Sequence, residues 1–321
     1  MNRRSSAIFV RFSAPPPRAD DDASPFDDPP PADRAPALER LLAGANAVRP
    51  VADWRRDAFQ VIAPAAEPWS NPCAPALYRA FGPVAARAAY FASPVVYRAT
   101  MTSVHLPHGG ILRLASAEAA ALAEDFGRVF GGADARLMAD SSGGLYCVFD
   151  RAVGADTADP EDALGLAIGR FQATGADGAR IAALMSEMEM WLFEHAVNRA
   201  RVRRGEPAIG GLWLWGGGAT LSRMPAIIGW TAGDDALFGA LDPVLEFPRD
   251  GRPGVVAIAA QPGSDEWRDA EARWLRPAVE ELCAGRLERL VLCAGRRRFD
   301  IDRRFRIRIW RRRRPWWGYF Q

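Results

Sequence analysis

A strand–helix–strand pattern in the last quarter of the chain constrains the fold more than any other feature. Val255–Ala260 and Leu287–Cys293 are short apolar runs, and the sequence from about Asp265 to Cys283 favours a helix, with an expected kink at Pro277. A crossover of this length joins parallel strands. The sequence therefore predicts an α/β fold with a mostly parallel sheet.

Helices and strands are also expected to interleave earlier in the chain. A hairpin is predicted around the turn at Pro107–Gly110, and a helix over Ala117–Phe130, with Ser116 as its N-cap and Gly131 as its C-cap. A long amphipathic helix is predicted from about Ala176 to Arg204. The remaining predicted strands are Ala7–Val10, the hairpin arms Val95–Leu106 and Ile111–Leu114, Leu145–Phe149 and Leu212–Trp215.

The segment after the first strand differs from the rest in composition. Ser13–Pro36 holds eight of the chain's 25 prolines together with two runs of aspartate. Such a segment buries too little apolar surface to offset the entropy of ordering it. The predicted organisation is thus a first strand in residues 1–12, a disordered linker in residues 13–37, and a single α/β domain over residues 38–321 with a basic C-terminal strand and tail.

Charge, cysteine spacing and hydropathy exclude several classes of protein. The net charge of +2 is nearly neutral, so no field of the whole protein attracts nucleic acid or a membrane. The four cysteines include no C-x-x-C pair, which argues against a zinc knuckle or a disulfide framework. No apolar run approaches the ~18 residues that span a bilayer. We expect reduced thiols and a cytoplasmic protein. All 41 basic residues are arginine, which either follows from codon usage or serves phosphate binding.

One stretch, Thr174–Gly218, carries a distinctive pattern. It contains the segment H-A-V-N-R-A-R over His195–Arg201, a glycine at Gly205, and L-W-L-W-G-G-G over Leu212–Gly218. This resembles the RpfE-type regulatory proteins of proteobacteria, with Ala196 in place of a proline and Gly210 in place of an asparagine. More remotely, it resembles the archaeal type of cofactor-independent phosphoglycerate mutase. A weaker match extends from Ser93 to the end of the chain.

The resemblance implies a reduced three-layer sandwich like that of the alkaline phosphatases and phosphoglycerate mutases. Enzymes of that class hold two metal ions with Asp and His ligands. This chain has only His105, His108 and His195, no histidine near Asp265–Asp269, and no Asp-Gly pair after the first strand. The shared metal site cannot be rebuilt from these residues. We therefore expect no metal and no cofactor, and we interpret the chain as a pseudoenzyme.

Two groups of residues are candidates for binding a ligand. His195, Asn198 and Arg201 recur along one face of the predicted helix, where they could grip a phosphate or carboxylate; alternatively, they are core residues that bond to nearby loop carbonyls. Gly216, Gly217 and Gly218 follow a strand, so their N–H groups form either an anion-binding nest or an ordinary tight turn.

The C-terminus alternates arginine with apolar residues. Strict alternation over Phe305–Ile309 predicts a half-buried strand with one arginine face, and Arg311–Trp317 mixes cations with aromatics. The segment is either a solvated edge strand that blocks aggregation or a tail that docks an anionic partner, such as nucleic acid or a membrane surface.

These observations support three hypotheses for function. The first is a non-catalytic regulatory or binding protein of the RpfE type, a degenerate mutase relative that takes a small phosphorylated acid. The second is an active mutase-like phosphotransfer enzyme. The third is an interaction protein that docks an anionic partner through its Arg/Trp tail.

Overall fold

The computed structural model describes residues 7–12, 34–66, 71–131, 134–258, 262, 264–308 and 311–319. Two compact units divide the chain, where the sequence predicts a single domain over 38–321. Of the described residues, the first unit takes those within 7–12, 34–66 and 225–319, and the second takes those within 71–224. Of the predicted linker at 13–37, residues 13–33 lie outside the described residues, and its end already belongs to the first helix.

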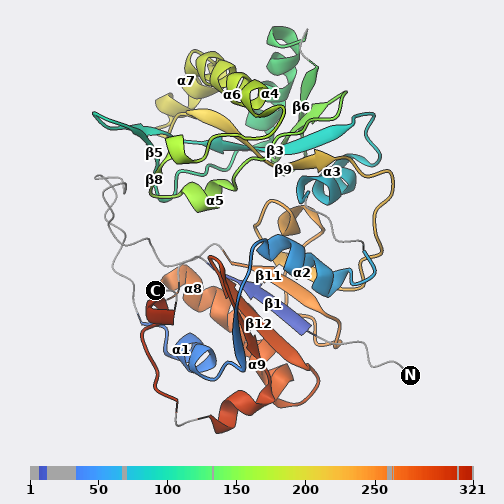
Figure 1. Cartoon of the computed structure of the whole chain (residues 1–321), viewed down its shortest axis with the longest axis vertical. Coiled ribbons are helices and arrows are strands. Elements are labelled where there is room, and N and C mark those ends of the chain that lie inside the picture. The colour runs from blue at the N-terminus through green and yellow to red at the C-terminus, as the bar shows by residue number, and fades with distance from the viewer. Residues whose placement is uncertain are drawn as a thin grey trace. The chain divides into compact units, whose positions relative to one another are not determined.

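The first unit contains the predicted parallel sheet (Figure 1). Its six strands, in spatial order, are β10 (Trp230–Gly233), β11 (Gly254–Ala257), β1 (Ala7–Arg11), β12 (Arg289–Ala294), β13 (Arg297–Ile301) and β2 (Ala47–Pro50). The first four are parallel, and β13 and β2 are antiparallel additions. The β-α-β prediction is confirmed, with β1 lying between its two strands.

Helices cover both faces of this sheet. Side chains of β1 alternate: Ile8 and Val10 join a core with α1, α8 and α9, whereas Phe9 stacks on Trp54 of α2 at 6.5 Å. This makes three layers, as the sequence predicts for the fold class. The helices are α1 (Pro36–Ala43), α2 (Trp54–Ile62), η2 (Phe238–Ala240), α8 (Asp265–Ala270), η3 (Glu271–Leu275), α9 (Arg276–Cys283), η4 (Arg303–Ile307) and η5 (Trp316–Tyr319).

The predicted kink at Pro277 takes the form of a π-helical turn. Residues Glu271–Leu275 are π-helical, and α9 continues directly with Pro277 in its first turn. A proline ring clashes with the carbonyl four residues earlier. The wider π turn lies at that position, so the helix continues through the proline without breaking.

The second unit has an antiparallel sheet that the sequence does not predict. Its order is β6 (Ala135–Ala139), β7 (Leu145–Phe149), β3 (Ala88–Val95) and β9 (Gly211–Ala219). A small sheet contains β4 (Arg98–Ala99), β5 (Val104–Leu106) and β8 (Leu166–Ala167). Buried side chains of α4 and α6 pack against the larger sheet. The helices are α3 (Cys73–Phe81), α4 (Ser116–Val129), α5 (Pro160–Ala163), η1 (Ile168–Arg170), α6 (Gly178–Phe193) and α7 (Ala196–Arg203).

The predicted hairpin forms only in part. Val95 bridges Ile111 in antiparallel fashion, and the turn is present, because the Gly110 N–H donates to the Pro107 carbonyl at 2.8 Å. The first arm, however, is not one strand: β4 and β5 lie within it and pair with each other.

The helix α4 is confirmed, but both predicted caps are wrong by one residue. Ser116 is the first helical residue, and the Glu118 carboxylate accepts the N–H of Ala115 at 3.1 Å. At the other end Phe130, not Gly131, is the C-cap. The acidic side chain in the first turn replaces the expected serine cap.

The strand predicted over Phe305–Ile309 is wrong. Residues Arg303–Ile307 form a 3₁₀ helix, and the basic strand is β13, an interior strand between β12 and β2. Asp302 caps the helical turn by accepting the Arg304 N–H at 2.8 Å, and the turn directs Phe305 into the core. Local capping therefore outweighs the alternating pattern.

Two other predictions concern cysteines and membranes. Cys73, Cys147, Cys283 and Cys293 are all free thiols, as predicted. Within the described parts of the chain, no helix combines the length and apolarity needed to cross a membrane.

Candidate functional site

The helix predicted from about Ala176 to Arg204 is two helices, because His195 ends the first and caps the second. α6 stops at Phe193, and His195 takes an extended backbone conformation before α7. Its Nδ1 accepts the N–H of Val197 at 3.1 Å. A side chain that accepts this bond satisfies an otherwise unpaired helix donor. His195 therefore does not lie on a continuous helical face with Asn198 and Arg201.

The imidazole of His195 is also held on its other side. Its ring lies 4.9 Å from the Trp191 ring, and its Nε2 lies 3.3 Å from Oδ2 of Asp125. The same Asp125 oxygen accepts the Trp191 indole N–H at 3.0 Å. Burial lowers the pKa of His195, and the Asp125 charge opposes that shift.

A depressed histidine pKa predicts a specific pH dependence of stability. The folded state favours the neutral imidazole of His195, because its pKa is lower there than in the unfolded chain. The stability that His195 contributes is therefore complete above its unfolded pKa of about 6.5, and it is lost as the pH falls below that value. We expect the wild type to lose more unfolding free energy than His195→Asn between about pH 7.5 and about pH 5.5. Asparagine keeps the capping role. Urea titrations at several pH values measure the difference, and parallel pH profiles would contradict it.

Asn198 and Arg201 are both buried and bonded inside the unit. The Asn198 amide donates to the carbonyls of Leu192 and Ile209, each at 2.8 Å, and accepts the Ile209 N–H at 2.7 Å. Arg201 donates to the Pro207 carbonyl at 2.8 Å and to Glu118 at 2.9 Å. These bonds fasten the segment after α7 to the helices. Asn198 and Arg201 thus have the contacts of core residues that bond to nearby loop carbonyls.

The three glycines lie within a strand. β9 continues through Gly216, Gly217 and Gly218 to Ala219, so the predicted turn is wrong. A Cβ on Gly217 would lie 2.0 Å from the Tyr90 ring, and Gly216 has a φ of 62°. The register of β3 and β9 shifts at this point. Glycine is required here because a side chain would not fit between the strands.

Of the remaining histidines, His105 lies in the small sheet and His108 lies in the turn that follows β5. His105 of β5 contacts the Ser103 hydroxyl at 2.7 Å, and His108 lies beside Gly165. Within the described residues, no three His, Cys, Asp or Glu side chains come together as a metal ion would require.

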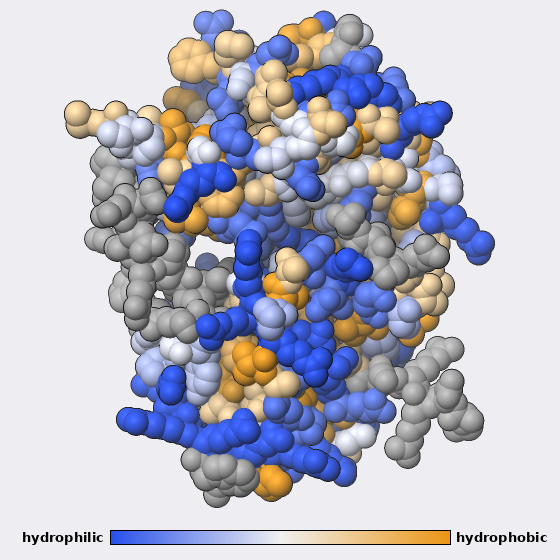
Figure 2. Space-filling model, viewed as in Figure 1, coloured by the Kyte–Doolittle hydropathy of each residue, from blue (hydrophilic) through white to orange (hydrophobic). Residues whose placement is uncertain are grey.

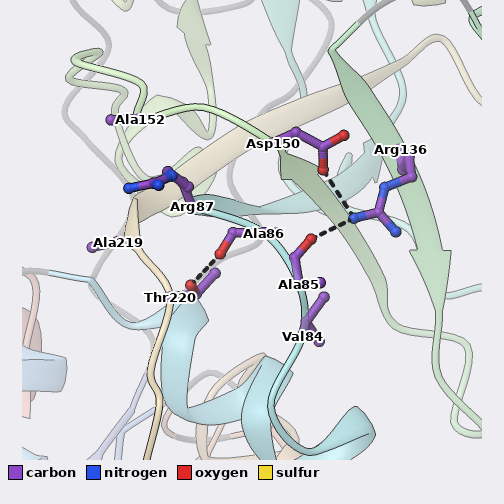
Figure 3. A pocket seen from close by; sticks show the side chains of 9 residues that line it. All are labelled: Val84, Ala85, Ala86, Arg87, Arg136, Asp150, Ala152, Ala219 and Thr220. Atoms are coloured by element: carbon purple, nitrogen blue, oxygen red, sulfur yellow. Dashed lines mark hydrogen bonds and ion pairs between the residues drawn. The ribbon is translucent and has the colours of Figure 1, made fainter.

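A hollow lies at one end of the antiparallel sheet of the second unit (Figure 3). Its volume is about 890 Å³. Four separate segments line it, through Val84, Ala85, Ala86, Arg87, Arg136, Asp150, Ala152, Ala219 and Thr220. No local motif marks these residues, because only the pairing of β3, β6, β7 and β9 brings them together.

The polar groups of the hollow differ in how they are engaged. Arg136 donates to the Ala85 carbonyl at 2.9 Å and to Asp150 at 3.1 Å, while the Thr220 hydroxyl donates to the Ala86 carbonyl at 2.6 Å. Arg87 is exposed, and its guanidinium has no partner among the described residues. Figure 3 shows Arg87 and Arg136 at opposite sides of the hollow. One cation is thus unpaired, and the second is shared with a carboxylate.

The carboxyl edge of the parallel sheet also carries arginines, and it is the edge at which open α/β sheets bind ligands. Arg11 ends β1, and its guanidinium lies 5.2 Å from the Trp54 ring. Arg55 lies over the same ring at 4.4 Å and pairs with Asp235 at 2.6 Å. The Arg55–Asp235 pair is almost fully buried, and it joins α2 to the turn after β10.

Comparison with known proteins adds a distant structural likeness. No family model matches the chain, and no curated protein matches it. Among solved structures, the chain is similar to a cofactor-independent phosphoglycerate mutase from Thermoplasma acidophilum, with 14% identity, 92% of this chain and 89% of that chain covered, and a TM-score of 0.36. It is also similar to the PH0037 protein from Pyrococcus horikoshii, with 11% identity, 93% and 87% covered, and a TM-score of 0.38. These likenesses concern the fold and carry no information on activity.

Proposed function

We propose that this chain is a non-catalytic regulatory protein of the RpfE type, a degenerate phosphoglycerate mutase relative that binds a small phosphorylated acid in the hollow beside Arg87. The observation that supports it most directly is the exposed Arg87 guanidinium, which has no partner among the described residues and borders a cavity of about 890 Å³. An unpaired guanidinium offers a bidentate fork to a phosphate or a carboxylate.

The second arginine suits a ligand with two anionic groups. Arg136 is half-exposed, and its pair with Asp150 has side-chain exposures of 50% and 65%. An ion pair so exposed to water contributes little to stability. Arg136 can therefore leave Asp150 and bind a ligand at small cost in free energy. A phosphate on Arg87 and a carboxylate on Arg136 would place one anionic group at each side of the hollow.

The residues of the RpfE-like pattern have a supporting role in this proposal. Asn198 and Arg201 fix the backbone that leads into β9. Gly216–Gly218 let the end of β9 pass Tyr90 and reach Thr220, which lines the hollow. None of these side chains is assigned to the ligand.

Arg87→Gln is expected to weaken binding of 3-phosphoglycerate by roughly tenfold, because one charge-assisted contact is lost. Isothermal titration of the full chain measures the change. Arg203→Gln is the matched control, since Arg203 is exposed on α7 and also lacks a partner among the described residues. Equal affinity in Arg87→Gln and the wild type would refute the proposed site.

Asp150→Asn is expected to have the opposite effect. It removes the carboxylate that competes for Arg136 and repels an incoming anion, so the affinity for 3-phosphoglycerate should rise by roughly threefold to tenfold. The same titration measures it. A weaker affinity in this variant would contradict a two-arginine mode of binding.

The competing hypothesis of an active mutase gives a different result. Turnover of 3-phosphoglycerate in the presence of Mn²⁺, abolished by a chelator, would establish catalysis and replace the present proposal. Under our proposal no turnover occurs, and binding is the same with and without the metal.

A further inference from the structure

The basic charge of the chain is concentrated at its C-terminal end. Residues 296–321 contain eleven arginines and two aspartates, in a chain whose net charge is +2. A charge asymmetry of this size indicates an anionic partner.

Part of this segment is fixed to the first unit. Trp316 is fully buried at 0% exposure, packs edge-on against Phe12, and its backbone N–H donates to Glu39 at 3.1 Å. Arg308 donates to the Gly44 carbonyl at 2.9 Å, and Arg311 donates to the Ala45 carbonyl at 2.6 Å. Arginines at the C-terminal end of α1 are favoured by the helix dipole. The described residues of this segment therefore form a fixed surface of the first unit.

Six other arginines of the segment are exposed and have no side-chain partner among the described residues. We call them the basic surface: Arg303, Arg304, Arg306, Arg312, Arg313 and Arg314. In Figure 2 a hydrophilic band crosses the lower end of the view, where Figure 1 draws the red C-terminal segment. Both aspartates nearby are used internally: Asp300 pairs with Arg298 at 3.0 Å, and Asp302 caps η4.

An exposed aliphatic side chain lies within this surface. Ile307 is 65% exposed at the end of η4, while Phe305 of the same turn is buried. In a 3₁₀ helix, residues three apart share a face, so Ile307 lies beside Arg304, and Arg306 lies beside Arg303. An apolar side chain among cations suits the boundary between lipid headgroups and acyl chains.

Binding of single-stranded nucleic acid would use exposed aromatics for base stacking. Trp316 is buried, and it packs against Trp317 at 5.9 Å. We therefore propose that the basic surface, with Ile307, docks the first unit on an anionic lipid membrane. Phosphate groups of the lipids would meet the arginines, and Ile307 would enter the interface.

The test uses the purified full chain and vesicles of phosphatidylcholine with or without phosphatidylglycerol. We expect co-sedimentation with the anionic vesicles only, and its loss at high salt. Each arginine near an anionic surface contributes about fivefold in affinity, so the triple variant Arg312→Gln, Arg313→Gln, Arg314→Gln should bind about 100-fold more weakly. A triple variant with the same charge change elsewhere, Arg203→Gln, Arg273→Gln, Arg276→Gln, is the matched control.

A second variant distinguishes binding to lipid from binding to nucleic acid. Ile307→Ser should weaken vesicle binding severalfold and leave any retention of duplex DNA or RNA unchanged. Absence of vesicle binding at low salt would overturn the proposal. So would tighter binding to nucleic acid than to anionic vesicles, or an equal loss of vesicle binding in the control triple variant.

Discussion

Replacing Asp235 by alanine is expected to lower the free energy of unfolding by about 3–5 kcal/mol. The Arg55 guanidinium donates to Asp235 from two nitrogens, at 2.6 and 2.8 Å, and the two side chains are only 5% and 3% exposed. Without the carboxylate, the buried Arg55 guanidinium loses both of these charge-assisted hydrogen bonds. The other oxygen of Asp235 also accepts the Leu237 N–H at 2.9 Å, and that bond is lost too. Urea unfolding followed by circular dichroism measures the change.

A double variant tests whether the buried charge is the cause. Arg55→Met with Asp235→Asn removes the charge together with its partner, so this protein should be markedly more stable than Asp235→Ala. The Trp54 ring keeps an apolar neighbour in place of the guanidinium that lies over it at 4.4 Å. The loss of unfolding free energy in the double variant is compared with the sum of the losses in Arg55→Met and Asp235→Asn measured separately. Equality of the two would show that the ion pair is not energetically coupled.

Asn198→Ala is expected to destabilise the second unit by about 3 kcal/mol. The change leaves the N–H of Ile209 and two carbonyls without their buried partner. Asn198→Asp should be at least as harmful, because a carboxylate keeps one acceptor but faces the carbonyls of Leu192 and Ile209, to which the amide donates. Chemical unfolding of both variants gives the comparison.

The same variant separates a structural role from a ligand contact. Under native conditions we expect folded Asn198→Ala to bind 3-phosphoglycerate as the wild type does, in contrast to Arg87→Gln. If the variant unfolds like the wild type but no longer binds 3-phosphoglycerate, Asn198 belongs to the binding site. The site would then not be the hollow beside Arg87. Thermal unfolding with and without ligand distinguishes the two results.

Several features of the fold follow from local sequence. Apolar runs such as Ala7–Val10 and Leu145–Phe149 appear as buried strands, and α4 is a helix within one residue of its predicted ends. The parallel β-α-β unit follows from the length of its crossover. In these segments, hydrophobic periodicity and chain connectivity leave few alternatives.

Other predictions failed where a single side chain or backbone contact determined the local structure. His195 fits the apolar face of one long helix by spacing, yet its side chain caps α7 and divides that helix. The alternation over Phe305–Ile309 fits a strand, but Asp302 stabilises a 3₁₀ turn. Periodicity describes which face of an element is apolar, and it does not record these competing hydrogen bonds.

The sequence alone determined the α/β class, the parallel strands, the free thiols and the concentration of arginine at the C-terminus, because each of these depends on composition or on neighbours along the chain. Only the tertiary structure decided that Asn198 and Arg201 bond inward, and that Arg87 and Arg136 border one hollow. It also decided which arginines of the tail are used in packing and which stay exposed. These outcomes depend on segments far apart in the chain, whose side chains meet only when the sheets are formed.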